Sequence, residues 1–145
     1  MPSWHYRVRV RLVKERVGRF GPTISCAGDI AALLIPEMAT LDREHFVCLH
    51  LDVKNRLISR ETVSIGHLSS ALCHPRECFK AAMLANAASV AFGHNHPSGD
   101  PEPSREDLEL TRRLFRAGEL LGLAVLDHVV IAGNRFISIA ERGLA

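Results

Sequence analysis

A proline-rich segment between residues 96 and 103 restricts the fold of this chain more than any other feature. Its sequence, HPSGDPEP, contains three prolines and one glycine, a composition typical of a loop. The short apolar run from Val90 to Gly93 precedes it and is consistent with a buried strand. Residues 104–121 follow with the periodicity of a helix. One face of this helix consists of Leu108, Thr111, Leu114, Phe115, Gly118 and Leu121. The sequence therefore predicts a buried strand, a rigid loop and an amphipathic helix, in that order.

The chain has 145 residues, which are enough for one domain and too few for two ordinary ones. Strand patterns occur at residues 6–14, 45–52, 57–65, 123–132 and 135–139. Helix patterns occur at residues 28–39, ended or interrupted near Pro36, and at residues 75–90. The order β-α-β-β-α-β-α-β-β predicts an α/β (α+β) fold, a mixed β-sheet flanked by helices. We expect residues 23–145 to form this domain, with residues 1–22 a basic strand and loop that belongs to it or is appended to it.

Positive charge is concentrated near the N-terminus, although the net charge is only +2. Arg7, Arg9 and Arg11 alternate with apolar residues, which predicts a strand with one basic face. Such a strand is either a solvated sheet edge, where charge discourages edge-to-edge pairing, or a surface for nucleic acid. We expect at most weak, non-specific DNA contact.

The cysteines and the apolar residues indicate a compartment. Cys26, Cys48, Cys73 and Cys78 form no Cys-x-x-Cys pair, which favours buried reduced thiols over a disulfide framework or a sulfur metal site. No apolar run approaches the roughly 20 residues that span a bilayer, and the first residues do not resemble a signal peptide. We therefore expect a cytoplasmic protein without membrane contact. Its oligomeric state cannot be read from the sequence.

The candidate site lies where the predicted strand enters the loop. His94 and His96, two residues apart on a strand, point to one face, and Asp107 lies in the first turn of the next helix. Two imidazoles and a carboxylate leave a fourth position open, as catalytic zinc sites do. Taken separately, a His-x-His pair more often consists of ordinary surface or core histidines than of metal ligands, and Ser104-x-x-Asp107 resembles a helix-capping box. We expect a bound metal to take the Asp107 carboxylate away from such a cap.

The spacing His-x-His-x7-Ser-x2-Asp, from His94 to Asp107, resembles the JAMM signature of JAB/MPN metalloproteases. Three segments resemble sequences of the RadC family in particular: HPRECFKAAMLANAASV, HNHPSGDPEPSREDLELT and GELLGLAVLDHVVIAGNRFIS. The resemblance covers roughly residues 25–145 and implies a single MPN/JAB domain that binds Zn²⁺. RadC proteins usually also carry a helix-hairpin-helix module, for which this sequence has no room, and this weakens an inference to DNA binding.

The resemblance also implies roles for individual residues. The family uses an upstream glutamate on a strand facing the metal, and Glu61 in RETVSIG is the position matched to it, as the general base. Taken without the family, Glu61 is a charged residue on a solvated strand face. Ser104 matches a serine that stabilises the oxyanion of the tetrahedral intermediate. His67 is expected to face solvent, and His74 and His128 to be structural.

The resemblance therefore implies a zinc-dependent metallopeptidase or isopeptidase that acts on an unidentified peptide or protein. Two alternatives remain open at this stage. The first is a non-catalytic MPN interaction module, and the second is a DNA-repair-associated accessory protein.

Overall fold

The computed structural model describes residues 3–17, 21–69 and 71–143. Its helices are α1 (Ala27–Met38), α2 (Pro75–Leu84) and α3 (Arg105–Leu121), and its strands are β1 (His45–Leu51), β2 (Leu57–Ile65), β3 (Ser89–Asn95), β4 (Ala124–Ala132) and β5 (Arg135–Ser138). The strands form one sheet in the order β2-β1-β3-β4-β5, in which β3 and β4 are parallel and the other neighbours antiparallel. The predicted mixed sheet flanked by helices is confirmed.

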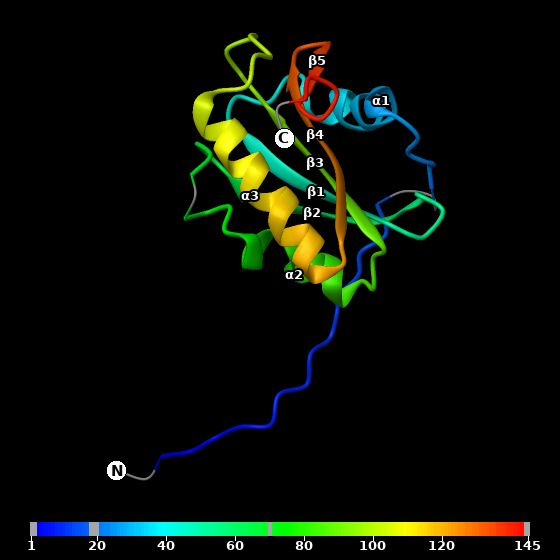
Figure 1. Ribbon diagram of the computed structural model, residues 1–145, viewed down its shortest axis with the longest axis vertical. Coiled ribbons are helices and arrows are strands. Elements are labelled where there is room, and N and C mark those ends of the chain that lie inside the picture. Colours follow the sequence, from blue (N-terminus) through cyan, green and yellow to red (C-terminus); the bar gives the residue numbers. More distant parts are fainter. Residues whose placement is uncertain (1–2, 18–20, 70, 144–145) are drawn as a thin grey trace.

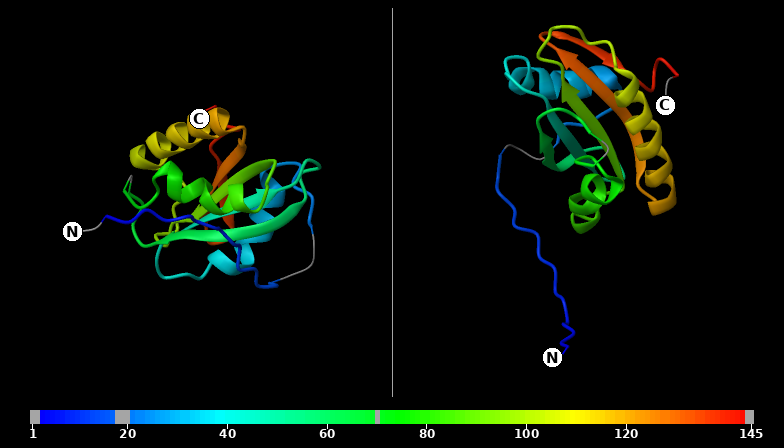
Figure 2. Two further views of the ribbon diagram at one scale, coloured as in Figure 1. Left: turned by 90° about the horizontal axis from the view of Figure 1, so that it is seen from below. Right: turned by 90° about the vertical axis from the view of Figure 1, so that its left-hand side faces the viewer.

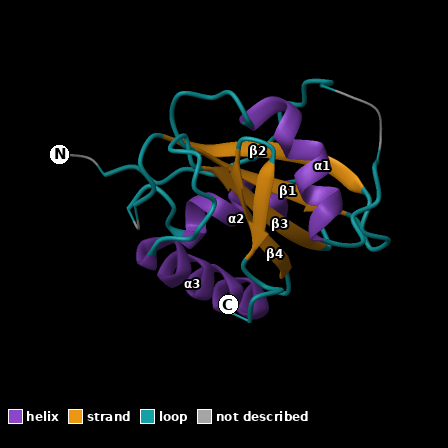
Figure 3. Cartoon of the chain, turned by 90° about the horizontal axis from the view of Figure 1, so that it is seen from above, coloured by secondary structure: helices purple, strands orange, loops and turns teal. Residues whose placement is uncertain are grey.

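The helices cover both faces of the sheet (Figures 1 and 3). Because side chains alternate along a strand, β1 contributes to two cores. Phe46 and Cys48 pack with α2 and α3, whereas Val47 and Leu49 pack with α1. The second and third views show the sheet between α1 and α3 (Figure 2). Burial on both faces explains the apolar runs FVCL in β1 and VAFG in β3.

β3 lies in the middle of the sheet, and all seven of its residues are buried. Gly93 lets α1 approach its far face, because a Cβ added there would lie 2.3 Å from the Leu34 side chain, which is fully buried. The next residue, His94, points to the opposite face, towards α3. The carboxyl end of β3 is thus fixed from both sides.

Of two predicted helices, one ends where expected and the other ends earlier. α1 contains Pro36 in its last turn and ends two residues later, near the proline as predicted, because the missing N–H of a proline there removes only one helical hydrogen bond. α2 ends at Leu84 and not at residue 90, since Asn86 adopts a left-handed conformation with φ 56° and turns the chain into β3. No helix in the described ranges is long and apolar enough to cross a membrane.

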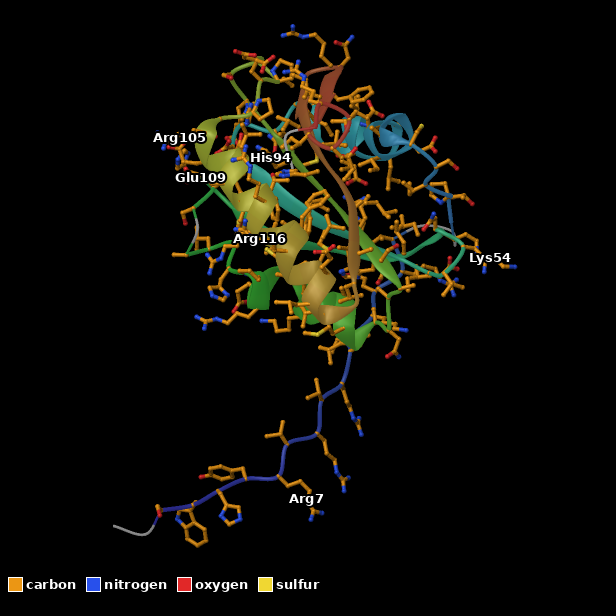
Figure 4. The ribbon with its side chains drawn as sticks, viewed as in Figure 1. Arg7, Lys54, His94, Arg105, Glu109 and Arg116 are labelled. Carbon is orange, nitrogen blue, oxygen red and sulfur yellow. The ribbon has the colours of Figure 1, made fainter. Side chains whose placement is uncertain are left out.

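The predicted strand at residues 6–14 is not formed. Residues 3–17 have no strand assignment and leave the body as an extended, almost fully exposed chain on which Arg7 is labelled (Figures 1 and 4). Within the described ranges, backbone pairing with the sheet begins only at Gly21 and Pro22, which exchange hydrogen bonds with Leu57 at the start of β2, and residues 3–17 have no partner strand. Weak DNA contact through this segment stays a prediction, and the predicted loop at residues 18–22 lies partly outside the described residues.

The core also contains a histidine that should make stability depend on pH. Burial lowers the pKa of His50 to about 4; its Nδ1 lies 2.7 Å from the Ser59 hydroxyl, and its Nε2 has no partner among the described residues. The unfolded chain, with a histidine pKa of about 6.5, therefore binds more protons between pH 6.5 and 4, and stability falls as the pH falls through this window.

We expect this histidine to lower the free energy of unfolding by roughly 2 kcal/mol at pH 5 relative to pH 8. Urea unfolding at both pH values should show that His50→Leu removes this part of the pH dependence. The exposed His5→Leu serves as the control and should behave as the wild type. An equal pH dependence in the wild type and His50→Leu would contradict the assignment.

Candidate metal centre

His94 lies at the carboxyl end of β3, close to the N-terminal part of α3 (Figure 4), and a second histidine follows two residues later. His94 is fully buried near the end of the strand, and His96 follows directly after it. Their side chains share one face of the sheet, and the two Nε2 atoms lie 3.0 Å apart. Two imidazole nitrogens directed at one point can both bind a single ion.

Asp107, in the first turn of α3, completes the cluster. Its Oδ2 lies 3.0 Å from Nε2 of His96 and 3.4 Å from Nε2 of His94. The structure thus brings the three predicted ligands together. The helix dipole adds to this placement, because the positive end of α3 stabilises a carboxylate in its first turn.

The Asp107 carboxylate takes part in a helix cap and in the cluster at the same time, and its release from the cap by a bound metal stays a prediction. Ser104 Oγ accepts a hydrogen bond from the Asp107 N–H at 3.0 Å, and Asp107 Oδ2 accepts one from the Ser104 N–H at 2.8 Å, which is a complete capping box. The same Oδ2 faces both histidines, since a carboxylate oxygen has two lone pairs. The cap therefore orients the ligand.

The electrostatics of the cluster favour an ionised carboxylate. Burial raises the pKa of Asp107, but the neighbouring His94 and His96 rings and the hydrogen bond from the Ser104 N–H outweigh it, and the net pKa is well below the usual range. The hydrogen bond to Asp107 raises the pKa of His96, while burial opposes this. A proton and a metal ion compete for the same His96 nitrogen, so metal binding weakens as the pH falls.

Contacts from the loop and the C-terminal region fix His96. Its Nδ1 lies 2.8 Å from the Asp100 carbonyl oxygen, which can only accept, so Nδ1 carries the proton and Nε2 is free to bind. Arg135 donates a hydrogen bond to the Gly99 carbonyl. Arg142 donates hydrogen bonds to both carboxylate oxygens of Glu102, each at 2.9 Å. The proline-rich loop is thus held in place from β5 and the turn that follows it.

A fourth residue, the acidic Glu44, also reaches this cluster and was not expected from the sequence. It forms a candidate metal-binding group with His94 and His96, whose ligand atoms all lie within 4.8 Å of one another. Its Oε1 is 3.8 Å from His96 Nε2, whereas Asp107 lies closer to both histidines. By distance, Asp107 is the better candidate for a third ligand, and Glu44 is a carboxylate beside the three.

Asn95, between the two histidines, fixes Glu44. Its Oδ1 accepts a hydrogen bond from the His45 N–H at 2.7 Å, and its Nδ2 donates one to the Arg43 carbonyl at 2.9 Å. The amide thus holds the backbone on both sides of Glu44. The Leu68 N–H donates to the Glu44 carboxylate at 3.3 Å and orients its other oxygen.

The structure does not bring Glu61 to the cluster, which corrects its expected place. Glu61 pairs with Cys48 of β1, whereas His94 pairs with Phe46. Two strand spacings of about 4.8 Å and two residue steps of about 3.3 Å separate the Cα atoms of Glu61 and His94 by roughly 12 Å. Glu61 lies instead near α2, where burial raises its pKa and the Lys80 charge lowers it.

Comparison with known proteins assigns this geometry to a family. The sequence model of the RadC-like JAB domain matches residues 24–144. The chain belongs to the RadC-like JAB domain family.

Several relatives of this RadC-like JAB domain are about half identical to it. A protein of Desulforamulus reducens is 52% identical over 121 residues, which are 83% of this chain and 53% of the relative. Another, of Desulfitobacterium hafniense, is 51% identical over 123 residues, 85% of this chain and 54% of the relative. A third, of Bacillus cereus, is 51% identical over 115 residues, 79% and 51% of the two chains. All three are named UPF0758 proteins, which states no activity, and the chain spans about half the length of these curated relatives.

The remaining histidines of this JAB domain have different surroundings. His67 is exposed, as expected, although its Nδ1 lies 3.4 Å from Glu44. His74 caps α2 by accepting a hydrogen bond from the Arg76 N–H, which is a structural role. His128 is fully buried on β4 and its Nε2 lies 2.7 Å from His94 Nδ1, a contact that no local sequence signal indicated.

The capping box predicts the effect of removing the Ser104 hydroxyl. Ser104→Ala should lower the free energy of unfolding by about 1 kcal/mol, because one N–H of the first turn of α3 loses its partner. Denaturant unfolding would measure this loss. The exposed Ser25→Ala, which removes a hydroxyl without a cap hydrogen bond, should leave stability nearly unchanged. Equal stability of the two variants would contradict the cap.

Proposed function

We propose that this RadC-like JAB domain is a zinc-dependent hydrolase of peptide or isopeptide bonds. The observation that carries the proposal is the convergence of His94, His96 and Asp107, with the Glu44 carboxylate beside them. Membership of the JAB family is compatible with hydrolysis. The activity and substrates of the longer relatives come to this chain only as part of this proposal.

The donor set supports zinc as the metal. With metal–ligand bonds of about 2.0–2.1 Å and tetrahedral angles, ligand atoms lie roughly 3.3 Å apart. The separations among His94, His96 and Asp107 are 3.0, 3.0 and 3.4 Å, close to this value. Two nitrogens and one oxygen also match the three-protein-ligand sets of catalytic zinc sites. Zinc in such a set supplies Lewis acidity and an acidified water at neutral pH.

Glu44 is better placed than Glu61 to act as the general base. It lies at the edge of the ligand cluster, half-buried, and Leu68 and Asn95 hold its carboxylate and backbone. From there its carboxylate can accept a proton from the attacking water and deliver it to the leaving amine. Glu61, near Lys80 on another part of the sheet, lies too far away for a direct transfer.

Ser104 remains a candidate oxyanion donor within this proposal. Its oxygen accepts the cap hydrogen bond from Asp107 N–H, which leaves its own proton free to donate to a substrate oxygen. Ser104 is exposed and lies one hydrogen bond away from the ligand carboxylate, so a bound carbonyl can approach it. Capping and oxyanion stabilisation are therefore compatible at this residue.

The ligand assignment predicts one zinc per chain. Elemental analysis of purified protein should give one equivalent for the wild type and for the exposed control His5→Ala. The double variant His94→Ala/His96→Ala removes two of three donors and should retain almost none. A full equivalent of zinc in the double variant would place the metal elsewhere.

The base assignment is tested by a matched pair of glutamate variants. Glu44→Gln should keep zinc and lower hydrolysis of a quenched-fluorescent peptide library about 10²–10⁴-fold, because glutamine cannot accept the proton. Glu61→Gln should keep both zinc and turnover. The reverse result, with turnover lost only in Glu61→Gln, would restore Glu61 as the base. Loss of zinc in Glu44→Gln would instead make Glu44 a ligand.

A further inference from the structure

Behind His94 lies a buried polar pair, His128 of β4 and Thr111 of α3. Neither side chain is exposed to solvent. The His128 ring packs edge-on against Phe46 and Phe92, with ring centroids 5.4 and 6.5 Å away. Two polar groups in such surroundings destabilise the fold unless each donor and acceptor is matched. Because each donor must face an acceptor, the hydrogen-bond partners of Thr111 and His128 indicate which atom carries each proton.

A chain of three short hydrogen bonds connects the pair to two metal ligands. Thr111 Oγ1 lies 2.6 Å from the Asp107 carbonyl oxygen and 2.6 Å from His128 Nδ1. His128 Nε2 lies 2.7 Å from His94 Nδ1. The chain thus runs from the backbone of one ligand, through Thr111 and His128, to the far side of the other ligand's ring.

The single hydroxyl proton of Thr111 determines every proton along this chain. A carbonyl oxygen can only accept, so Thr111 donates to Asp107 and must accept from Nδ1–H of His128. A neutral His128 then has an unprotonated Nε2, which accepts from Nδ1–H of His94. His94 in turn presents an unprotonated Nε2 to the cluster.

The opposite arrangement is unfavourable. If Thr111 donated to His128, the hydroxyl and the Asp107 carbonyl would face each other with lone pairs at 2.6 Å. His94 would then carry a proton on Nε2 and could not bind a metal. A doubly protonated His128 would be a fully buried cation, and no carboxylate is hydrogen-bonded to its ring within the described residues.

We propose that Thr111 and His128 are positioning residues that hold His94 in its Nδ1–H tautomer, with Nε2 prepared to bind a metal. The inference rests on the proposed metal site for its purpose. The same hydroxyl bonds the backbone of Asp107, so Thr111 orients two of the three ligands. Hydrogen-bond partners of this kind typically contribute 10–100-fold to metal affinity.

Nuclear magnetic resonance of the metal-free wild type tests the tautomers without reference to zinc. Long-range ¹H–¹⁵N spectra of the imidazoles should show Nδ1–H and an unprotonated Nε2 for both His94 and His128. A proton on Nε2 of either ring would overturn the proposal. The tautomers can be determined even if the protein binds no zinc. Failure to bind zinc would contradict the proposed function but not the assignment of the tautomers.

Zinc affinity, measured by competition with a chromophoric chelator, tests the consequence. Thr111→Val keeps the shape of the side chain but removes the hydroxyl, and it should weaken zinc binding about tenfold or more. Thr111→Ser restores the hydroxyl and should bind nearly as the wild type does. The control Thr62→Val changes an exposed threonine of β2 and should have no effect. Zinc binding of Thr111→Val equal to that of the wild type would overturn the proposal.

Discussion

The pairing of β3 with β1 on one side and β4 on the other is the constraint on which the site depends. Antiparallel pairing sets Phe46 opposite His94, so Glu44 lies near the residues that follow β3. Parallel pairing sets His128 opposite Phe92, one strand away from His94 and on the same face. A shift of one residue in either register would turn these side chains to the α1 face, where the core is apolar.

The site is prepared by bonds that also belong to the fold. Asp107 is at once a cap of α3 and a neighbour of both histidines. Asn95 holds the backbone around Glu44, and His128 fills a space between aromatic rings while it contacts His94. Because these groups are ordered during folding, a metal ion would meet ligands that have already lost most of their freedom.

Distance along the chain determines which site residues could be predicted from the sequence and which could not. His94, His96, Ser104 and Asp107 lie within one strand–loop–helix segment, and local spacing together with the JAMM resemblance predicted that they meet. Glu44 and His128 come from β1 and β4, and only the order of strands in the sheet brings them to the site. Glu61 has the correct residue type and the correct face, but it lies three residues before Ser64, the residue of β2 that is level with Phe46 and His94. The alternating pattern at residues 6–14 wrongly predicted a strand, because a strand also needs a partner, which periodicity does not reveal.

X-ray absorption at the zinc edge of the zinc-loaded protein tests the central claim most directly. Bound by His94, His96 and Asp107, zinc should show a first shell of nitrogen and oxygen atoms at about 2.0–2.1 Å, without sulfur. Outer-shell scattering from two imidazoles should accompany it. A sulfur shell at about 2.3 Å would place the metal on the buried cysteines of the core, and together with missing imidazole scattering it would contradict the account.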